Sequence, residues 1–225
     1  MRKIEKKLKL AEPIIRNFQR DAYPLLVMAA NSDDYLPWVY SNFVQLMMNK
    51  EEYVEQNWYR VMYCNQYIGF QSPFLETIKL KHSYMKLFKF DICDFLKTNI
   101  DSGYYTMLSL DKYYVPNTVT YHTIHMQHDT MIYGYDSSSF KLVGYGHMGK
   151  FEQNSVSFED FKEAFDALCI TYNWWNDVVY VFRYDNTVKY DFNKRLFKRL
   201  LEDYYLGQNT PEYTQEEIAQ RNKDI

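Results

Sequence analysis

The sequence predicts an α+β fold in which N-terminal helices pack on a mainly antiparallel sheet. Helix signals come first along the chain, and strand-forming residues around turns follow them. With 225 residues, of which 47% are hydrophobic, the chain is long enough for one domain with a sizeable core. Helices followed by antiparallel strands are typical of the α+β class.

The clearest predicted element is a β-hairpin. Residues 130–135 and 140–145 are rich in β-branched and aromatic side chains, and turn-forming residues at 136–139 separate them. His128 lies near the end of the first strand that is far from the turn, where a rigid sheet can present the imidazole to a cleft. This placement suits a general base, because a base must be positioned before its pKa matters. The alternative is a histidine packed at a sheet edge.

The first predicted helix covers residues 22–30, with Asp21 as its N-cap and Pro24 in its first turn. A second helix is expected over residues 36–50. Four short elements should follow before the hairpin: helices at 73–81 and 91–99, and strands at 85–90 and 104–110.

Beyond the hairpin, Ser157 and Asp160 approximate a capping box and predict a helix to about residue 172. A strand at 178–184 and a helix at 192–206 complete the predicted domain. The expected organisation is a basic N-terminal arm at 1–12, one domain at 13–206, and a polar C-terminal tail or helix at 207–225.

Composition argues against several classes of protein. The net charge of −3 and the pI of about 6.0 provide no basic field for nucleic acid. Cys64, Cys93 and Cys169 are too few and too scattered for a disulfide framework. No run approaches the roughly 18 apolar residues of a membrane span, and the N-terminus lacks a signal-peptide core. We therefore expect a cytoplasmic protein that binds neither nucleic acid nor membrane.

One part of the sequence resembles a known family. The resemblance is carried by Gly103-Tyr104-Tyr105, Leu110-Asp111-Lys112-Tyr113-Tyr114-Val115-Pro116, His128-Asp129-Thr130-Met131-Ile132-Tyr133-Gly134-Tyr135-Asp136, and Val156-Ser157-Phe158-Glu159-Asp160-Phe161 with Ala164-Phe165. These segments look like the butirosin biosynthesis protein H family, with similarity in kind to the peptidase-like transferase of the closthioamide pathway. The resemblance spans about residues 13–185. It implies the papain-like fold of bacteriocin-processing cysteine peptidases.

The resemblance also implies site residues, and two positions depart from the family pattern. The cysteine nucleophile is expected at the start of the first buried helix, where this chain has Ala22. Either the natural protein has lost its nucleophile or alanine has replaced cysteine in this chain. His128 is the expected base, and the Asp or Asn that should orient it falls at Gly144. Gln19 and Asn17 are the expected oxyanion residues.

The implied activity is acyl transfer in natural-product biosynthesis. An acyl group, possibly aromatic given 23 Tyr and 15 Phe, would pass from the phosphopantetheine thioester of an acyl carrier protein to a small-molecule amine, forming an amide. No other cofactor is implied. A bacteriocin-processing type of cysteine peptidase is one alternative, and a non-catalytic binding module is another if Ala22 is native.

Three further patterns in the sequence each have a simpler interpretation than a functional one. His122, His125 and His128 recur every three residues, but no cysteine or carboxylate cluster nearby completes a metal site. Cys64 is a second possible nucleophile, although a buried inert thiol is the simpler interpretation. Trp174-Trp175 suits packing and could also line an aromatic acyl pocket. No Walker A or Rossmann glycine pattern occurs.

Overall fold

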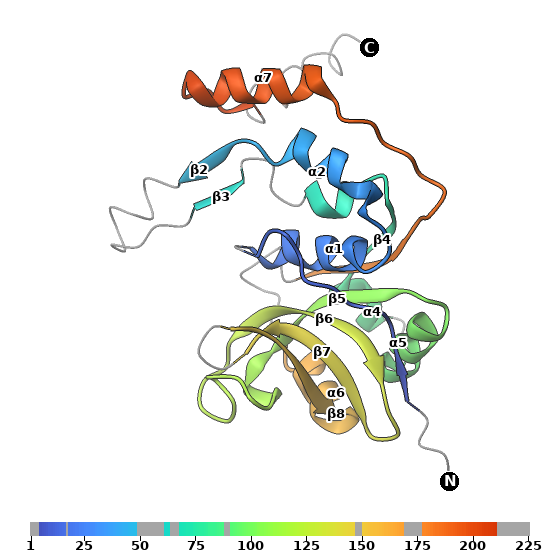
Figure 1. The fold of residues 1–225 in the computed structure, drawn as a ribbon. Coiled ribbons are helices and arrows are strands. Elements are labelled where there is room, and N and C mark those ends of the chain that lie inside the picture. Colours follow the sequence, from blue (N-terminus) through green and yellow to red (C-terminus); the bar gives the residue numbers. More distant parts are fainter. Residues whose placement is uncertain are drawn as a thin grey trace.

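The protein has an α+β fold, as the sequence predicts, and its sheet lies between helices (Figure 1). The computed structural model describes residues 5–16, 18–48, 61–63, 68–87, 91–146, 150–168 and 177–210. The strands are β1 Lys6–Lys7, β2 Leu46–Met48, β3 Val61–Tyr63, β4 Leu75–Lys81, β5 Tyr105–Asp111, β6 Gln127–Tyr135, β7 Ser139–Tyr145, β8 Phe151–Ser157 and β9 Val178–Tyr184. The α-helices are α1 Gln19–Ala29, α2 Leu36–Asn42, α4 His82–Leu87, α5 Ile92–Asp101, α6 Phe158–Asp166 and α7 Lys194–Tyr205. Short 3-10 helices are η1 Asp33–Tyr35, η2 Ile68–Gln71 and η3 Lys112–Tyr114.

The main sheet runs in the order β4-β9-β5-β6-β7-β8, and its neighbours pair antiparallel. The predicted hairpin is confirmed as β6 and β7, and Ser138 and Ser139 donate their backbone N–H groups to the Asp136 carboxylate in its turn. Residues of the expected N-terminal arm join this sheet, since β1 pairs with the end of β6 that lies next to the hairpin turn.

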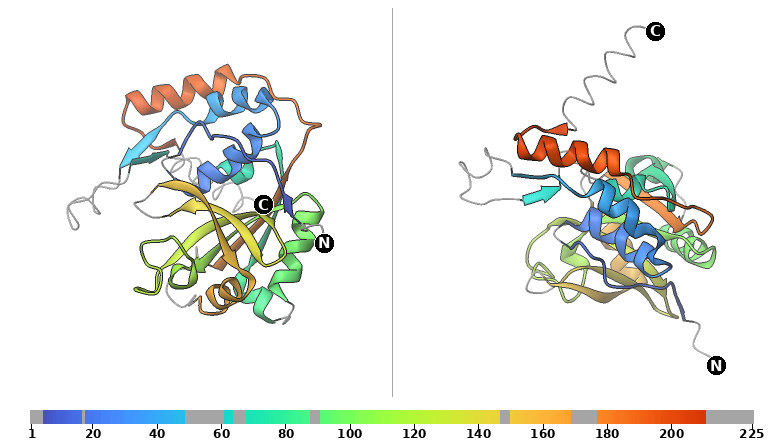
Figure 2. Two further views of the ribbon diagram at one scale, coloured as in Figure 1. Left: turned by 60° about the horizontal axis from the view of Figure 1, so that its bottom comes forward. Right: turned by 45° about the horizontal axis from the view of Figure 1, so that its top comes forward.

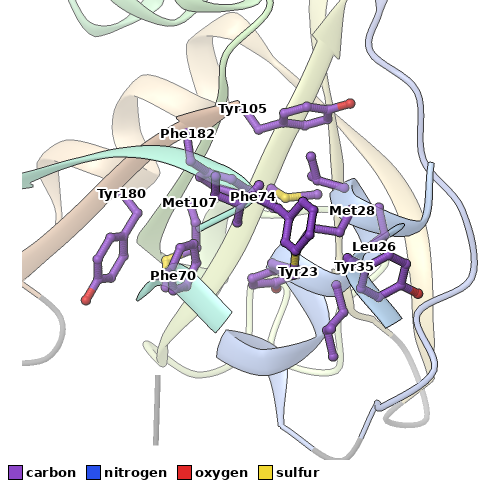
Figure 3. Close-up of a cluster of buried hydrophobic side chains, with 14 of the residues drawn as sticks. Tyr23, Leu26, Met28, Tyr35, Phe70, Phe74, Tyr105, Met107, Tyr180 and Phe182 are labelled. Carbon is purple, nitrogen blue, oxygen red and sulfur yellow. The ribbon is translucent and has the colours of Figure 1, made fainter. Parts of the chain in front are cut away.

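The two faces of the sheet bury separate apolar clusters. On one face α1 packs Tyr23 and Met28 against Met107 and Phe182 of the sheet (Figure 3). On the other face α5 and α6 cover residues such as Leu108. Burying both faces explains why β5 is buried along its whole length. Helix α1 is therefore held firmly against the sheet, and it brings its N-terminal turn to the sheet's edge.

Beyond α1, a further layer lies away from the sheet (Figures 1 and 2). Helix α7 packs beside α2, where the Gln45 amide donates to Leu200 O and the Asn193 N–H donates to Ser41 Oγ. The short β2–β3 pair continues this layer. The sheet, α1 and the α2–α7 pair thus form successive layers.

Helix α1 begins earlier than predicted. Gln19 is its first residue and Phe18 occupies the N-cap without a side-chain hydrogen bond, so the expected N-cap, Asp21, lies inside the first turn. Pro24 is a helix-interior residue, not a first-turn one. A proline there leaves the Arg20 carbonyl without its helical donor, and Gly69 of η2 packs closely over Pro24 at this point.

Three predicted elements of the first half are wrong. The helix expected over residues 36–50 ends at Asn42, and β2 follows because its backbone pairs with β3. Residues 75–81 form β4 rather than a helix, because they pair along their whole length with β9. Residues 85–87, expected in a strand, belong to α4, while 88–90 lie outside the described residues. In each case strand pairing or packing outweighs a weak local preference.

The later elements follow the sequence more closely. The strand at 104–110, the helix at 91–99, the strand at 178–184 and the helix at 192–206 are confirmed within two residues at each end as β5, α5, β9 and α7. The capping box is confirmed, since Ser157 Oγ accepts from Asp160 N at 3.0 Å and donates to the Asp160 carboxylate. Helix α6 ends at Asp166 instead of near residue 172.

Candidate functional site

The candidate site lies where β6 and β7 part. Their pairing starts at the turn and stops at Met131 opposite Val143, although β6 begins four residues earlier and pairs there with β5 alone. The backbone carbonyl of Asp129 therefore has no partner on β7, and it accepts hydrogen bonds from α1 instead. Tyr23 Oη donates to it at 3.2 Å, and Gln19 Nε2 lies 3.4 Å from it.

His128 meets Gln19 at this edge of the sheet. Gln19 Nε2 lies 2.9 Å from His128 Nδ1, and both side chains are largely shielded from solvent. With the amide in this orientation its nitrogen can only donate, so Nδ1 accepts, and a neutral imidazole then carries its proton on Nε2. Donation from His128 Nδ1 to its neighbour's carbonyl, Asp129 O, is the competing arrangement at 3.3 Å. We favour the shorter contact, because Asp129 O already accepts from Tyr23.

A buried ion pair fixes α1 to β6 beside the histidine. Arg20 Nε lies 2.6 Å from Asp129 Oδ2 and Arg20 Nη2 lies 3.3 Å from Oδ1, while Ser109 Oγ donates to Oδ1 at 2.7 Å. The side chains of Arg20 and Asp129 are only 4% and 11% exposed. Such a two-pronged pair sets the register of the helix on the strand. It holds Gln19 in reach of His128.

Two further charged residues nearby in the chain or in space are buried and have shifted pKa values. Lys112, the first residue of η3, is 3% exposed, and burial lowers the pKa of its ammonium to about 8. Burial also lowers the pKa of His128, and the positive charge of Lys112 lowers it further. Asp21 is 1% exposed, its Oδ1 has no hydrogen-bond partner, and burial raises its pKa to about 7.

The position expected to hold the nucleophile is inside the helix. Ala22 is the fourth residue of α1 and is fully buried. Its backbone N–H donates to Phe18 O at 2.9 Å. In the conformation seen here this N–H therefore serves the helix and cannot serve as an oxyanion donor, which leaves the Gln19 amide as the predicted oxyanion group in place.

The position expected to orient the histidine is filled from α1. A Cβ at Gly144 would lie 2.9 Å from Tyr23 Oη and 3.7 Å from Asp129 O. The hydroxyl of Tyr23 thus occupies the space that a side chain at 144 would enter. The structure therefore brings Gly144 to the same site as His128 and Gln19, with a tyrosine in place of the expected carboxylate.

Several other predicted residues take no part in this cluster. Asn17, Cys64, Cys169 and Trp174-Trp175 lie outside the described residues. Cys93 is buried on α5, where burial raises the pKa of its thiol. His122 stacks between Tyr121 and Tyr113. His125 Nδ1 lies 2.6 Å from the Asp111 carboxylate and its side chain is exposed.

Sequence reasoning missed Arg20, Ser109 and Lys112. Nothing in the sequence marks Arg20 and Asp129 as partners, because they are 109 residues apart. For Lys112 the one available signal was its position, because it directly follows the buried strand β5. In the part of the chain that the structure describes, no group of three or more His, Cys, Asp or Glu side chains could hold a metal ion.

Comparisons with family models and with curated proteins return no match. Among the described helices, none is both long and apolar enough to cross a membrane. The interpretation of the site therefore depends on its own geometry.

Proposed function

We propose that this chain has a papain-like fold whose site serves acyl transfer from a carrier-protein thioester to an amine. The observation that carries the proposal is the 2.9 Å contact between Gln19 Nε2 and His128 Nδ1. It joins a predicted base on a strand to a predicted oxyanion donor on the first buried helix, across 109 residues of sequence. Acyl transfer needs these two groups together, since the histidine moves the proton and the glutamine amide stabilises the negative charge on oxygen.

In the complete reaction a thiol at position 22 supplies the nucleophile. His128 takes the thiol proton on Nδ1, which ends the hydrogen bond that Nδ1 accepts from Gln19. The freed Gln19 N–H then donates to the developing oxyanion as the thiolate attacks the thioester carbon. The bond to the phosphopantetheine sulfur then breaks. The sulfur takes the proton from His128 and leaves as a thiol. An amine attacks the new thioester, His128 removes its proton, and the amide departs as the thiol of residue 22 is regenerated. The carrier-bound substrate is consistent with a cytoplasmic protein.

As it stands, the chain holds alanine at this position, and this favours a second candidate. Ala22 is fully buried and its N–H already belongs to the helix. A chain with these features can bind an acylated partner without turning it over. The second candidate function is therefore a non-catalytic binding module built on the same fold.

The test restores the sulfur. Ala22→Cys is incubated with benzoyl-N-acetylcysteamine, a small thioester that carries an aromatic acyl group, and with a benzoyl-loaded acyl carrier protein. We expect the intact mass to rise by one benzoyl group, and neutral hydroxylamine or an added amine to remove it. Water alone removing the group as fast as an amine does would favour the peptidase alternative.

Two controls make the result specific. Ala29→Cys places a thiol at the other end of α1 and should gain no benzoyl group under conditions that label Ala22→Cys. Ala22→Cys combined with His128→Ala should lose at least tenfold in acylation rate, since general-base assistance contributes about 100-fold or more. A folded Ala22→Cys protein that gains no acyl group from either donor contradicts the acyltransferase proposal and leaves the binding module.

A further inference from the structure

His125, three residues before His128, has a carboxylate partner on its imidazole ring. Its Nδ1 lies 2.6 Å from Asp111 Oδ2. Because a carboxylate only accepts hydrogen bonds, Nδ1 carries the proton, and Nε2 of the neutral ring is the nitrogen that accepts one. The Asp111 side chain is 5% exposed and that of His125 is 65% exposed. A buried carboxylate thus orients an imidazole at the surface, as in catalytic Asp–His pairs.

The Asp111 carboxylate is itself held in place. Its Oδ1 accepts from the backbone N–H groups of Tyr113 at 3.1 Å and Met126 at 3.2 Å, while Oδ2 meets His125. The His125 ring also stacks on the Tyr113 ring, with centroids 4.3 Å apart and planes at 14°. The imidazole is therefore fixed in orientation although most of it is exposed. A group that transfers protons requires such positioning.

Strand register places this pair beside His128. Asp111 is the last residue of β5, and the residue before it, Leu110, pairs with His128 on β6. Directly opposed residues of antiparallel strands have Cα atoms about 4.5–5.5 Å apart. Asp111 is therefore one residue along the chain from the backbone partner of His128.

The Asp111 carboxylate lies on the face of the sheet that α1 covers. Alternate residues of a strand share a face, so Asp111 lies on the same face as Ser109. Ser109 Oγ donates to Asp129, whose carboxylate pairs with Arg20 in the first turn of α1. The Asp111–His125 pair thus begins on the side of the sheet that carries the first turn of α1 and position 22.

The surface around His125 is aromatic and uncharged. Residues 113–126 include no Asp, Glu, Lys or Arg. His122 also stacks on the Tyr113 ring, at 5.2 Å between centroids, and Ile124 and Met126 are 64% and 41% exposed. An amine with an apolar or aromatic body gains by covering such a surface, whereas an amine with a further charged group meets no counter-charge in this segment.

We propose that His125, oriented by Asp111, is the catalytic base for the acceptor amine, and that this amine has an apolar or aromatic body. The inference rests on the proposed function and divides its two half-reactions between two histidines. His128 serves the thiol, and His125 takes over the amine step that a one-histidine scheme gives to His128. Asp111 provides a counter-charge for the imidazolium of His125, whereas the Nδ1 partner of His128 is an amide donor.

In the amine step, the amine nitrogen forms a bond to the acyl carbon of the thioester as its proton passes to His125 Nε2. The bond from that carbon to the sulfur of residue 22 then breaks, and the amide leaves. The sulfur takes a proton from solvent. His125 returns its proton to solvent across its exposed side, so no net proton is consumed.

The test separates the two half-reactions in the Ala22→Cys protein. Benzoyl-N-acetylcysteamine loads the benzoyl group, excess donor is removed, and benzylamine then takes the group off, with both steps followed by intact mass. Adding His125→Ala should slow removal by benzylamine about tenfold or more and leave loading within about twofold. Added imidazole should restore removal in His125→Ala more than in its parent, because most of the His125 side chain is exposed. A purely structural role would show no such rescue.

Asp111→Asn tests the positioning role of the carboxylate. The two backbone N–H donors keep the Asn oxygen at the place of Oδ1 and turn its NH2 toward His125 Nδ1. Nδ1 must then accept, so the ring proton moves to Nε2, which no longer takes one. We expect removal by benzylamine to slow about tenfold or more. Nitrogen-15 NMR of labelled histidine should show the proton of neutral His125 on Nε2 instead of Nδ1, with His125→Gln assigning the signal.

His122→Asn is the matched control, because His122 stacks on the same Tyr113 ring and Asn tolerates its positive φ of 52°. It should leave loading and removal unchanged. Glycine resembles benzylamine in basicity but adds a carboxylate, so it should remove the benzoyl group more slowly. Removal by glycine as fast as by benzylamine contradicts the class of amine.

The inference and the proposed function fail in different ways. Normal loading of Ala22→Cys, followed by removal that His125→Ala leaves unchanged, overturns the role of His125 and keeps the proposed function. An Ala22→Cys protein that never loads contradicts the proposed function and the inference with it.

Discussion

Arg20 and Asp21 are neighbours in α1, both almost fully buried, and they differ in what they meet. The Arg20 guanidinium has a two-pronged carboxylate partner on β6, whereas Asp21 Oδ1 has no hydrogen-bond partner at all. A second contrast lies on the sheet side, where Asp129 accepts from Arg20 and Ser109, whereas burial lowers the pKa of Lys112. A satisfied ion pair thus lies next in the chain to a buried carboxylate that has an unsatisfied oxygen.

The difference separates two roles for buried charge. A paired charge fixes one arrangement of helix and strand, and its loss leaves the partner stranded. An unpaired buried charge costs stability and shifts its own pKa, as at functional sites where a perturbed proton affinity is used. On this view the ion pair maintains the site, whereas burial shifts the pKa values of Lys112 and Asp21 themselves.

The largest effect should come from breaking the pair. Asp129→Asn removes the carboxylate that the buried Arg20 guanidinium contacts with two nitrogens, and we expect a loss of about 3–5 kcal/mol in the free energy of unfolding, measured with urea. The control is Glu76→Gln, which breaks the exposed Arg183–Glu76 pair of the same sheet. Its N···O distance is 2.7 Å, against 2.6 Å for Arg20–Asp129. That loss should stay within about 1 kcal/mol. Equal losses in the two variants would contradict the contrast.

Asp21 should make stability depend on pH. Its pKa rises from 3.8 to about 7 on folding, so the native state holds a proton that the unfolded chain releases. The stabilisation is complete below about pH 4 and is lost as the pH rises to about 7. Over this range the free energy of unfolding should fall by about 4 kcal/mol. Asp21→Asn should remove this slope in urea unfolding curves. Asp33→Asn, at an exposed site, should keep it, and a wild-type curve that is flat from pH 4 to 7 would rule the effect out.

Lys112 should show the opposite dependence. Burial lowers its pKa from 10.5 to about 8, so the unfolded chain binds the extra proton and stability rises between about pH 8 and pH 10.5. Lys112→Met removes the burial cost and should stabilise the protein at pH 7 by up to about 3 kcal/mol. Thermal or urea unfolding of Lys112→Met and the exposed control Lys81→Met measures it. A Lys112→Met protein less stable than wild type would mean that the lysine has a structural partner.

The sequence predicts the parts of this molecule that local pattern determines. The β6–β7 hairpin and the Ser157 cap depend on residues close together in the chain, and both are confirmed. Strand β4 was missed because its residues Leu75, Ile78 and Leu80 do not alternate, and pairing with β9 is what makes it a strand. The three-residue β2 was missed for a similar reason.

The residues of the site also fall into those that the sequence could indicate and those that it could not. His128, Gln19 and Gly144 could be selected from the sequence, by placement or by resemblance, and the structure brings them together. The Arg20–Asp129 pair and the burial of Lys112 could not be predicted, because they depend on how the layers of the fold pack together. Burial is a property of the assembled layers, and an isolated lysine or aspartate carries no sign of it.

The smallest effect tests how the site has adapted to Gly144. Gly144→Ala would place a Cβ 2.9 Å from Tyr23 Oη, so the hydroxyl must shift and its hydrogen bond to Asp129 O weakens. We expect a loss of about 1–2 kcal/mol in the free energy of unfolding. In a Tyr23→Phe background the hydroxyl is absent, and the same Gly144→Ala change should cost less than about 1 kcal/mol. Additive losses in this double-mutant cycle would show that Tyr23 does not occupy the position of the missing orienting side chain.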